Sequence, residues 1–230
     1  RRCCGEKGRD RAARRLGAGV GSRGWAETVG LAAVVGAVTN AHVDWGGALR
    51  KAGAEIAKTG PLDFSALMYS CQNGHDQCAR ALLKAGANLE ATNNEGMTAL
   101  LWACTNGHDQ CARALLEMGA QVDHALDDGF TALMYSCQNG HDQCARALLK
   151  AGANLEATLP SGSTALILSC QNGHDLCARA LIEKGADLDK VTDDGQSMSA
   201  LFLACWKGHE SCARLLIEKG ADVNKETTVG

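Results

Sequence analysis

Proline, aromatic residues and long apolar runs are all scarce in this chain. Two of its 230 residues are proline and 4% are aromatic, so we expect Leu, Ala, Val and Cys to fill the core. The apolar run at 29–38 is about half as long as a membrane-spanning helix must be. The sequence therefore predicts no membrane segment. Its 27 glycines favour many short helices joined by tight turns.

Sequence signatures of catalysis are also missing. The chain carries no phosphate-binding loop, no quartet of metal ligands with a known zinc spacing and no nucleophile beside a general base. An acidic residue follows each repeated histidine, but adjacent residues at a helix start point in different directions and do not form a catalytic pair. We therefore expect a protein that is not an enzyme and uses no cofactor or metal.

Excess basic charge is confined to the N-terminal arm. Residues 1–29 hold eight basic and three acidic residues, a net charge of +5, which leaves −8 on the other 201 residues. Binding to nucleic acid needs clustered Lys and Arg, so the acidic body is not expected to bind it. The arm could touch nucleic acid or act as an address signal, but we expect a solvated, mostly irregular terminus.

One pattern, by contrast, is abundant. The sequence Cys-x-x-Gly-His-x-x-Cys-Ala-Arg occurs five times. The first four copies recur with a constant period of about 33 residues, and the fifth follows two positions late. A unit of this length cannot bury its own apolar face, so the copies must stack around one continuous core. The copies begin at Cys71, Cys104, Cys137, Cys170 and Cys205.

The second copy shows the local signals most clearly. Thr98 is a predicted N-cap, because its hydroxyl can accept from a free backbone N–H of a short first helix. Gly107 ends that helix, and Asp109 suits the positive end of the dipole of a second helix. Cys111 and Leu115 follow helical spacing, which gives the second helix a buried face.

These features resemble the ankyrin repeat family over about residues 63–227. The matching elements are the Thr-Ala-Leu starts, the Gly-His pairs, the Leu-Leu or Leu-Ile with Gly-Ala endings and the period of about 33 residues. The resemblance implies an all-α, ankyrin-like α-solenoid of stacked helix-turn-helix repeats with projecting β-turn fingers. It also implies that the histidine of each Gly-His pair bonds backbone at the repeat junction. Repeats of this family also carry a histidine in a Thr-Pro-Leu-His sequence at the start of the first helix. That histidine is absent here, and Leu101, Met134 or Ile167 stands in its place.

The repeat register divides the whole chain. Stepping back by one repeat period places His42 under His75, so we expect a degenerate capping repeat upstream of the first clear copy. We therefore interpret the apolar run in this segment as the first helix of the capping repeat and not as the core of a secretory signal. The predicted segments are an irregular arm at 1–29, the capping repeat at 30–62, repeats at 63–95, 96–128, 129–161 and 162–194, and a last repeat at 195–230 with a two-residue insertion and a short polar tail.

Three interpretations compete for the two cysteines of each repeat. A zinc site would find only three ligands in the spacing Cys-x3-His-x2-Cys, one short of the usual four. A disulfide could join the two cysteines of one repeat across its helix hairpin, as between Cys71 and Cys78. We expect the third, in which cysteine is a small apolar core filler in a reducing compartment.

Partner recognition should depend on positions that differ between repeats. In ankyrin-like stacks the finger tips and the ends of the first helices line a concave surface, and exposed Met, Phe and Trp are common binding anchors. Acidic finger tips favour a partner with a basic segment. An aromatic row at one repeat position (Tyr69, Trp102, Tyr135) is either a stripe on this surface or half-buried packing between first helices. The predicted protein-binding residues are Glu95, Met97, Thr105, Asp127, Asp128, Phe130, Asp193, Asp194, Trp206 and Lys207.

The sequence thus predicts a non-enzymatic protein–protein interaction module or adaptor. We expect a monomer that binds another protein and lies in the cytoplasm. A nuclear location is the alternative. One alternative is the targeting fragment of a larger ankyrin-containing enzyme, such as a kinase or ubiquitin ligase, or of a channel. The other is a metal-binding array built from the recurrent Cys and His.

Overall fold

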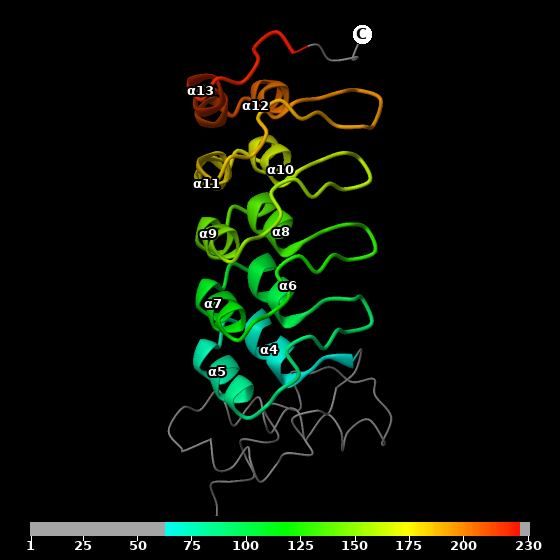
Figure 1. Ribbon diagram of the computed structural model, residues 1–230, viewed down its shortest axis with the longest axis vertical. Coiled ribbons are helices and arrows are strands. Elements are labelled where there is room, and N and C mark those ends of the chain that lie inside the picture. Colours follow the sequence, from blue (N-terminus) through cyan, green and yellow to red (C-terminus); the bar gives the residue numbers. More distant parts are fainter. Residues whose placement is uncertain (1–62, 226–230) are drawn as a thin grey trace, which may run out of the picture.

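The computed structural model describes residues 63–225 as a stack of ten helices in five antiparallel pairs (Figure 1). Between 63 and 225 no strand forms, only two isolated bridges, 125–131 and 191–199. This confirms the all-α solenoid. The arm at 1–29 and the capping repeat at 30–62 lie outside the described residues. The first helices are α4 (Ala66–Gln72), α6 (Ala99–Thr105), α8 (Ala132–Gln138), α10 (Ala165–Gln171) and α12 (Ala200–Lys207); the second helices are α5 (Asp76–Lys84), α7 (Asp109–Glu117), α9 (Asp142–Lys150), α11 (Asp175–Glu183) and α13 (Glu210–Glu218).

Each first helix begins at a hydroxyl cap. The Thr98 side chain accepts a hydrogen bond from the backbone N–H of Leu101 at 3.3 Å, which confirms the predicted cap. Ser65 plays the same part for α4, accepting from Met68 N–H at 3.2 Å. Such a cap stabilises a helix by about 1 kcal/mol. The other first helices are capped in the same way by Thr131, Thr164 and Ser199.

Two rows of helices and one row of loops make up the stack. Figure 1 shows the first helices in one row, the second helices in a row beside it, and long loops that project from the side of the first helices. The core lies between the rows and consists of Leu, Ala, Cys, Met and Ile, with Phe64 at its start. Valine, expected there, is absent from the buried residues between 63 and 225. The position of the missing family histidine is filled by fully buried apolar side chains: Met68, Leu101, Met134 and Ile167.

Neighbouring repeats are joined by a histidine. The His108 Nε2–H donates to the Gln72 carbonyl, at the last turn of the preceding first helix, at 3.1 Å. The contact needs space, because a Cβ built on Gly74 would come within 2.5 Å of His108 Nδ1. The predicted backbone bond of this histidine is therefore confirmed. The equivalent bonds join His141 to Thr105, His174 to Gln138 and His209 to Gln171, at 3.0–3.1 Å.

Replacing the glycine beside the histidine ring by alanine should show how much the junction contributes to the free energy of unfolding, apart from the cost of backbone strain. Gly107 and Gly119 both have positive φ, +74° and +86°, but only a Cβ at Gly107 would clash, 2.5 Å from His141 Nδ1. Gly119→Ala should cost about 1 kcal/mol of unfolding free energy from the left-handed backbone alone. Gly107→Ala should cost at least about 1 kcal/mol more, because the ring must move. Urea unfolding measures both, and equal losses would contradict this account of the junction.

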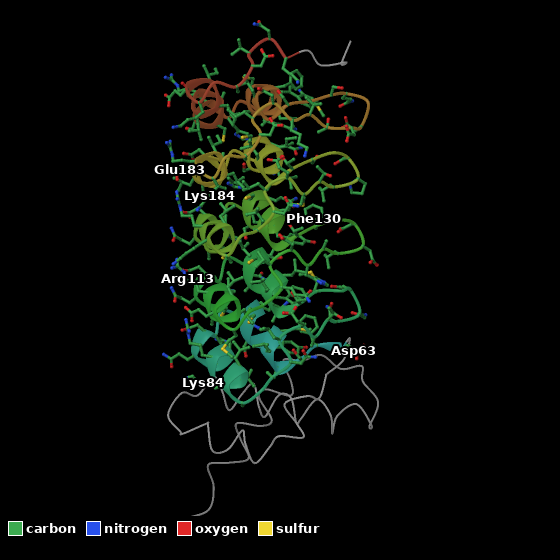
Figure 2. The ribbon with its side chains drawn as sticks, viewed as in Figure 1. Asp63, Lys84, Arg113, Phe130, Glu183 and Lys184 are labelled. Carbon is green, nitrogen blue, oxygen red and sulfur yellow. The ribbon has the colours of Figure 1, made fainter. Side chains whose placement is uncertain are left out.

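Ion pairs cross alternate junctions on the outer face of the second helices. Arg80 reaches Glu117 at 3.0 Å and Arg146 reaches Glu183 at 3.5 Å, each pair spanning 37 residues. Arg113, by contrast, has Lys150 at the same spacing and instead contacts Asp109 of its own helix at 3.3 Å. The repeated arginines thus pair with an acid of the neighbouring repeat at two junctions. Lys84, Arg113, Glu183 and Lys184 lie on the side opposite Phe130 (Figure 2).

A carboxylate at position 150 should add the ion pair that is missing at the junction between the other two. Lys150→Glu would place an acid at the same distance along the chain from Arg113, and the exposed pair should contribute about 0.5–1 kcal/mol at low salt. Lys184→Glu is the matched control, since it makes the same charge change near a helix C-terminus but has Ala147 at that spacing. We expect Lys150→Glu to unfold at higher urea than Lys184→Glu, and the difference to shrink in high salt. Equal midpoints at low salt would refute the pairing.

Candidate interaction surface

Four loops project from the stack on the side of the first helices (Figure 1). We call them fingers 1 to 4, residues 93–97, 126–130, 159–163 and 192–198. The first residue of each finger donates its backbone N–H to the carbonyl of the last residue, which closes the loop at its base. The four bonds run from Asn93 to Met97, Leu126 to Phe130, Leu159 to Ser163 and Thr192 to Met198, at 3.0–3.1 Å.

Polar side chains shape the turns within the fingers. Asn93 Oδ1 accepts from the backbone N–H of Glu95 at 3.1 Å and of Met97 at 2.8 Å. Asp128 Oδ1 accepts from Phe130 N–H at 3.1 Å in finger 2. Asp194 Oδ1 accepts from Gln196 N–H at 3.1 Å and from the Thr192 hydroxyl at 2.8 Å in finger 4. These short-range bonds fix each tip by local turn chemistry.

A second set of acidic residues ties each repeat to the next. Glu90 Oε1 accepts from the backbone N–H of Gln121 at 2.9 Å, and Asp123 Oδ1 accepts from Asn154 N–H at the same distance. Glu156 and Asp189 repeat the contact one and two junctions later, at 3.0 and 2.8 Å. These residues were not predicted, although an acidic residue recurs at this position once in every repeat period. They are structural because they bond backbone.

Two further contacts join neighbouring fingers directly. The His124 Nε2–H donates to the Gly96 carbonyl at 3.0 Å, linking the base of finger 2 to finger 1. The Asp193 N–H donates to the Ser161 carbonyl at 2.7 Å, linking finger 4 to finger 3. The fingers are thus positioned by the stack and by one another. His124 carried no sequence signal, because no other repeat has a histidine at its position.

The predicted acidic residues stand at the finger tips and are exposed. Unlike the acids at the junctions, they do not occur in every finger. Fingers 1, 2 and 4 carry them, whereas finger 3 presents the uncharged Pro160 and Ser161 at its tip. The exposed tip carboxylates are Glu95, Asp127, Asp128, Asp193 and Asp194.

Two of these carboxylates act on an aromatic side chain. Phe130 stacks on Tyr135 with ring centroids 4.8 Å apart and an interplanar angle of 28°. Burial raises the pKa of Tyr135, and the negative charges of Asp128 and Glu95 raise it further. We call these four residues the acidic–aromatic cluster. It places two half-buried rings beside two exposed carboxylates, a combination suited to a cationic side chain.

Met97 is not a surface residue, and its prediction as a binding anchor is wrong. It is only 6% exposed and packs in the core. The physical reason is its place at the last position of finger 1, directly before the Thr98 cap, where the chain re-enters the stack. Thr105 is half-buried, and its hydroxyl donates to the Leu101 carbonyl at 2.8 Å. Its own carbonyl accepts the junction bond from His141.

Trp206 and Lys207 form a separate exposed pair at the end of α12. Trp206 is 64% exposed, and Lys207 Nζ lies 5.0 Å from the centroid of its ring. Phe202 of the same helix lies near Trp206, with its ring centroid 6.1 Å from that of Trp206. These two predicted residues thus come together, but on a helix end of the last described repeat and not on a finger.

The aromatic row packs as half-buried side chains. Phe64 lies 4.7 Å from Tyr69 and 5.1 Å from Trp102, measured between ring centroids. Tyr69, Trp102 and Tyr135 are each half-buried and pack against the core. Of the two alternatives for this row, the structure favours packing. The partners of Tyr69 and Tyr135 are phenylalanines just before the first helices, which the sequence analysis did not foresee.

The cysteines lie mostly in the core, as expected for small apolar fillers. Of the ten described cysteines nine are buried, and Cys205 is exposed, contrary to that expectation. The thiol of Cys71 donates a hydrogen bond to the sulfur of Cys111 in the next repeat. Thiol contacts therefore cross the junctions, whereas the disulfide alternative would have joined the two cysteines of one repeat. In residues 63–225 no group of three or more His, Cys, Asp or Glu side chains is placed to hold a metal ion.

The geometry defines an α-solenoid of helix-turn-helix repeats with projecting loops. The sequence matches the family described as ankyrin repeats (3 copies) over residues 37–125, 67–159 and 152–227. The chain belongs to the ankyrin repeat family. Among curated proteins, none matches it significantly. In the part of the chain that the structure describes, no helix has the length and apolar character to cross a membrane.

The acidic–aromatic cluster can be tested through Tyr135. In a Tyr69→Phe background Tyr135 is the only tyrosine, so ultraviolet absorbance follows its ionisation alone. Glu95→Gln with Asp128→Asn should lower the pKa of Tyr135, because the phenolate then meets fewer negative charges. Asp193→Asn with Asp194→Asn removes the same charge from finger 4 and should leave the pKa of Tyr135 unchanged. An unchanged pKa in the first variant would show that the carboxylates do not face the ring.

Proposed function

We propose that this protein is a non-enzymatic interaction module that binds a basic segment of a partner protein along its finger tips. Ankyrin repeats are in general protein–protein interaction modules. The observation that supports the finer proposal is the row of five exposed carboxylates on fingers 1, 2 and 4. The fingers project on the side of the first helices (Figure 1), whereas Lys84, Arg113 and Lys184 lie on the opposite side of the molecule (Figure 2).

The fingers are ordered before a partner arrives. Each tip is held by its own turn bonds, and neighbouring fingers are joined through His124 and Asp193. A surface that is already ordered loses little conformational entropy on binding, so more of the contact energy appears as affinity. The basic segment would therefore meet carboxylates at fixed positions.

Charge and aromatic surface act together at finger 2. A Lys or Arg side chain there can lie on the Tyr135 ring while its charge faces Asp128 and Glu95. Finger 3 has no charge at its tip, so the acidic residues form two groups, one on fingers 1 and 2 and one on finger 4. A bound segment would best match this surface with two basic groups separated by an uncharged stretch.

Neutralising finger 2 tests the proposal with an oligo-arginine peptide as the probe. Asp127→Asn with Asp128→Asn removes two charges and keeps an oxygen acceptor for the turn at residue 128. Binding should weaken roughly fivefold, since each exposed charge contributes about 0.5 kcal/mol. The dissociation constant is measured by fluorescence anisotropy at low and high salt, and the affinity should fall as salt rises.

A matched variant separates the finger surface from overall charge. Glu117→Gln with Glu183→Gln removes the same two charges from the second helices, where they pair with Arg80 and Arg146. This variant should bind the peptide about as well as the unmodified protein. If both double variants weaken binding equally, only net charge matters and the finger tips are not the site.

A further inference from the structure

Four junctions of the stack each hold two cysteines in direct contact. In every case the thiol of a first helix donates a hydrogen bond to the sulfur of the second helix of the following repeat, and all eight sulfur-bearing residues are fully buried. The pairs come from residues 40 or 42 positions apart in the sequence. They are Cys71 with Cys111, Cys104 with Cys144, Cys137 with Cys177 and Cys170 with Cys212.

The third junction shows how the contact is held. Helices α8 and α11, which carry Cys137 and Cys177, touch each other across the junction. The Cys137 thiol donates to Cys177, whose own thiol donates to the Ser136 carbonyl at 3.8 Å. The Cys177 sulfur therefore lies beside the Cys137 position of α8, within reach of the Cys137 thiol. That arrangement is what a disulfide needs before its bond can form.

Cys205 shows what the following repeat contributes. It occupies the position of Cys71, Cys104, Cys137 and Cys170 in the last described repeat. It is exposed, whereas those four are fully buried. Burial of a first-helix thiol thus depends on the repeat stacked against it. Cys205 is the natural reference for a thiol that is open to reagents but has no partner across a described junction.

We propose that the four pairs are sites of oxidative cross-linking, at which a hydroperoxide converts two thiols into a disulfide between neighbouring repeats. One sulfur attacks the peroxide, the O–O bond breaks, and a sulfenic acid forms with release of an alcohol or water. The second sulfur attacks the sulfenic sulfur and releases water. The two thiols lose two electrons and two protons in total, and the peroxide is reduced.

The junction at the last described repeat should react first. A junction must open before an oxidant reaches a buried sulfur, and a repeat with a single neighbour opens at the lowest cost. The hydrogen bond donated by Cys170 also lowers the pKa of the Cys212 thiol, which favours the nucleophilic thiolate. The bond from Cys71 lowers the pKa of Cys111 in the same way.

The test uses the full chain with Cys3, Cys4 and Cys205 replaced by serine. Nine of the twelve cysteines are then left, and four disulfides would consume eight of them. The folded protein is treated with hydrogen peroxide in increasing urea below its unfolding midpoint, so that junctions open without global unfolding. Remaining thiols are blocked, and the protein is digested without reductant and analysed by mass spectrometry.

We expect free thiols to fall from nine towards one, and the peptide joining Cys170 to Cys212 to be among the first to appear. The unfolding midpoint should rise and return to its starting value after reduction, because each disulfide restrains the unfolded chain. A Cys212→Ser variant should lose that one cross-link and keep the other three. Cross-links between Cys71 and Cys78, a random set of pairs, sulfinic acids without cross-links, or nine free thiols at every urea concentration would each overturn the proposal.

Discussion

The hydrogen bond from a histidine ring to the last-turn carbonyl of the preceding first helix is the contact on which the rest of the stack depends. Carbonyls at a helix C-terminus have no partner within the helix and are costly to bury unbonded. The His108 ring satisfies the Gln72 carbonyl, and Gly74 leaves the space that the ring occupies. Because the same bond recurs at each described junction, it sets one spacing for the helices, the fingers and the cysteines alike.

That spacing explains why two different ladders appear beside the histidines. Once neighbouring repeats stand at a fixed distance, Glu90 reaches the backbone of Gln121, and the contact recurs at each later junction. The same geometry brings the Cys71 thiol onto Cys111. Fingers carried on such a frame do not need strands of their own, and their tips are free to differ. The surface can therefore vary in charge without changing the fold.

Local signals made most of the fold predictable from the sequence. The Thr98 cap, the Gly107 turn and the buried face of Cys111 and Leu115 are each set by a few adjacent residues, and all are found in the structure. The features that could not be predicted depend on which side chains meet between neighbouring repeats. Met97 resembles a finger residue in sequence, yet the chain turns inward at its position. The thiol pairs join residues about 40 apart, a separation for which pattern within a single repeat gives no signal.

Repetition itself separates two kinds of residue here. A side chain that recurs once in every repeat faces the same neighbour at every junction, so it belongs to the frame. The residues at a finger tip instead change between repeats, as from Asp127 to Pro160, and face solvent. The cysteines belong to the frame by this criterion, but their thiols can react as well as pack. A covalent bond between Cys137 and Cys177 would hold the same two repeats that His174 holds through a hydrogen bond. Because fingers 2 and 3 are carried by those repeats, the state of the thiols and the placement of the acidic surface are physically linked.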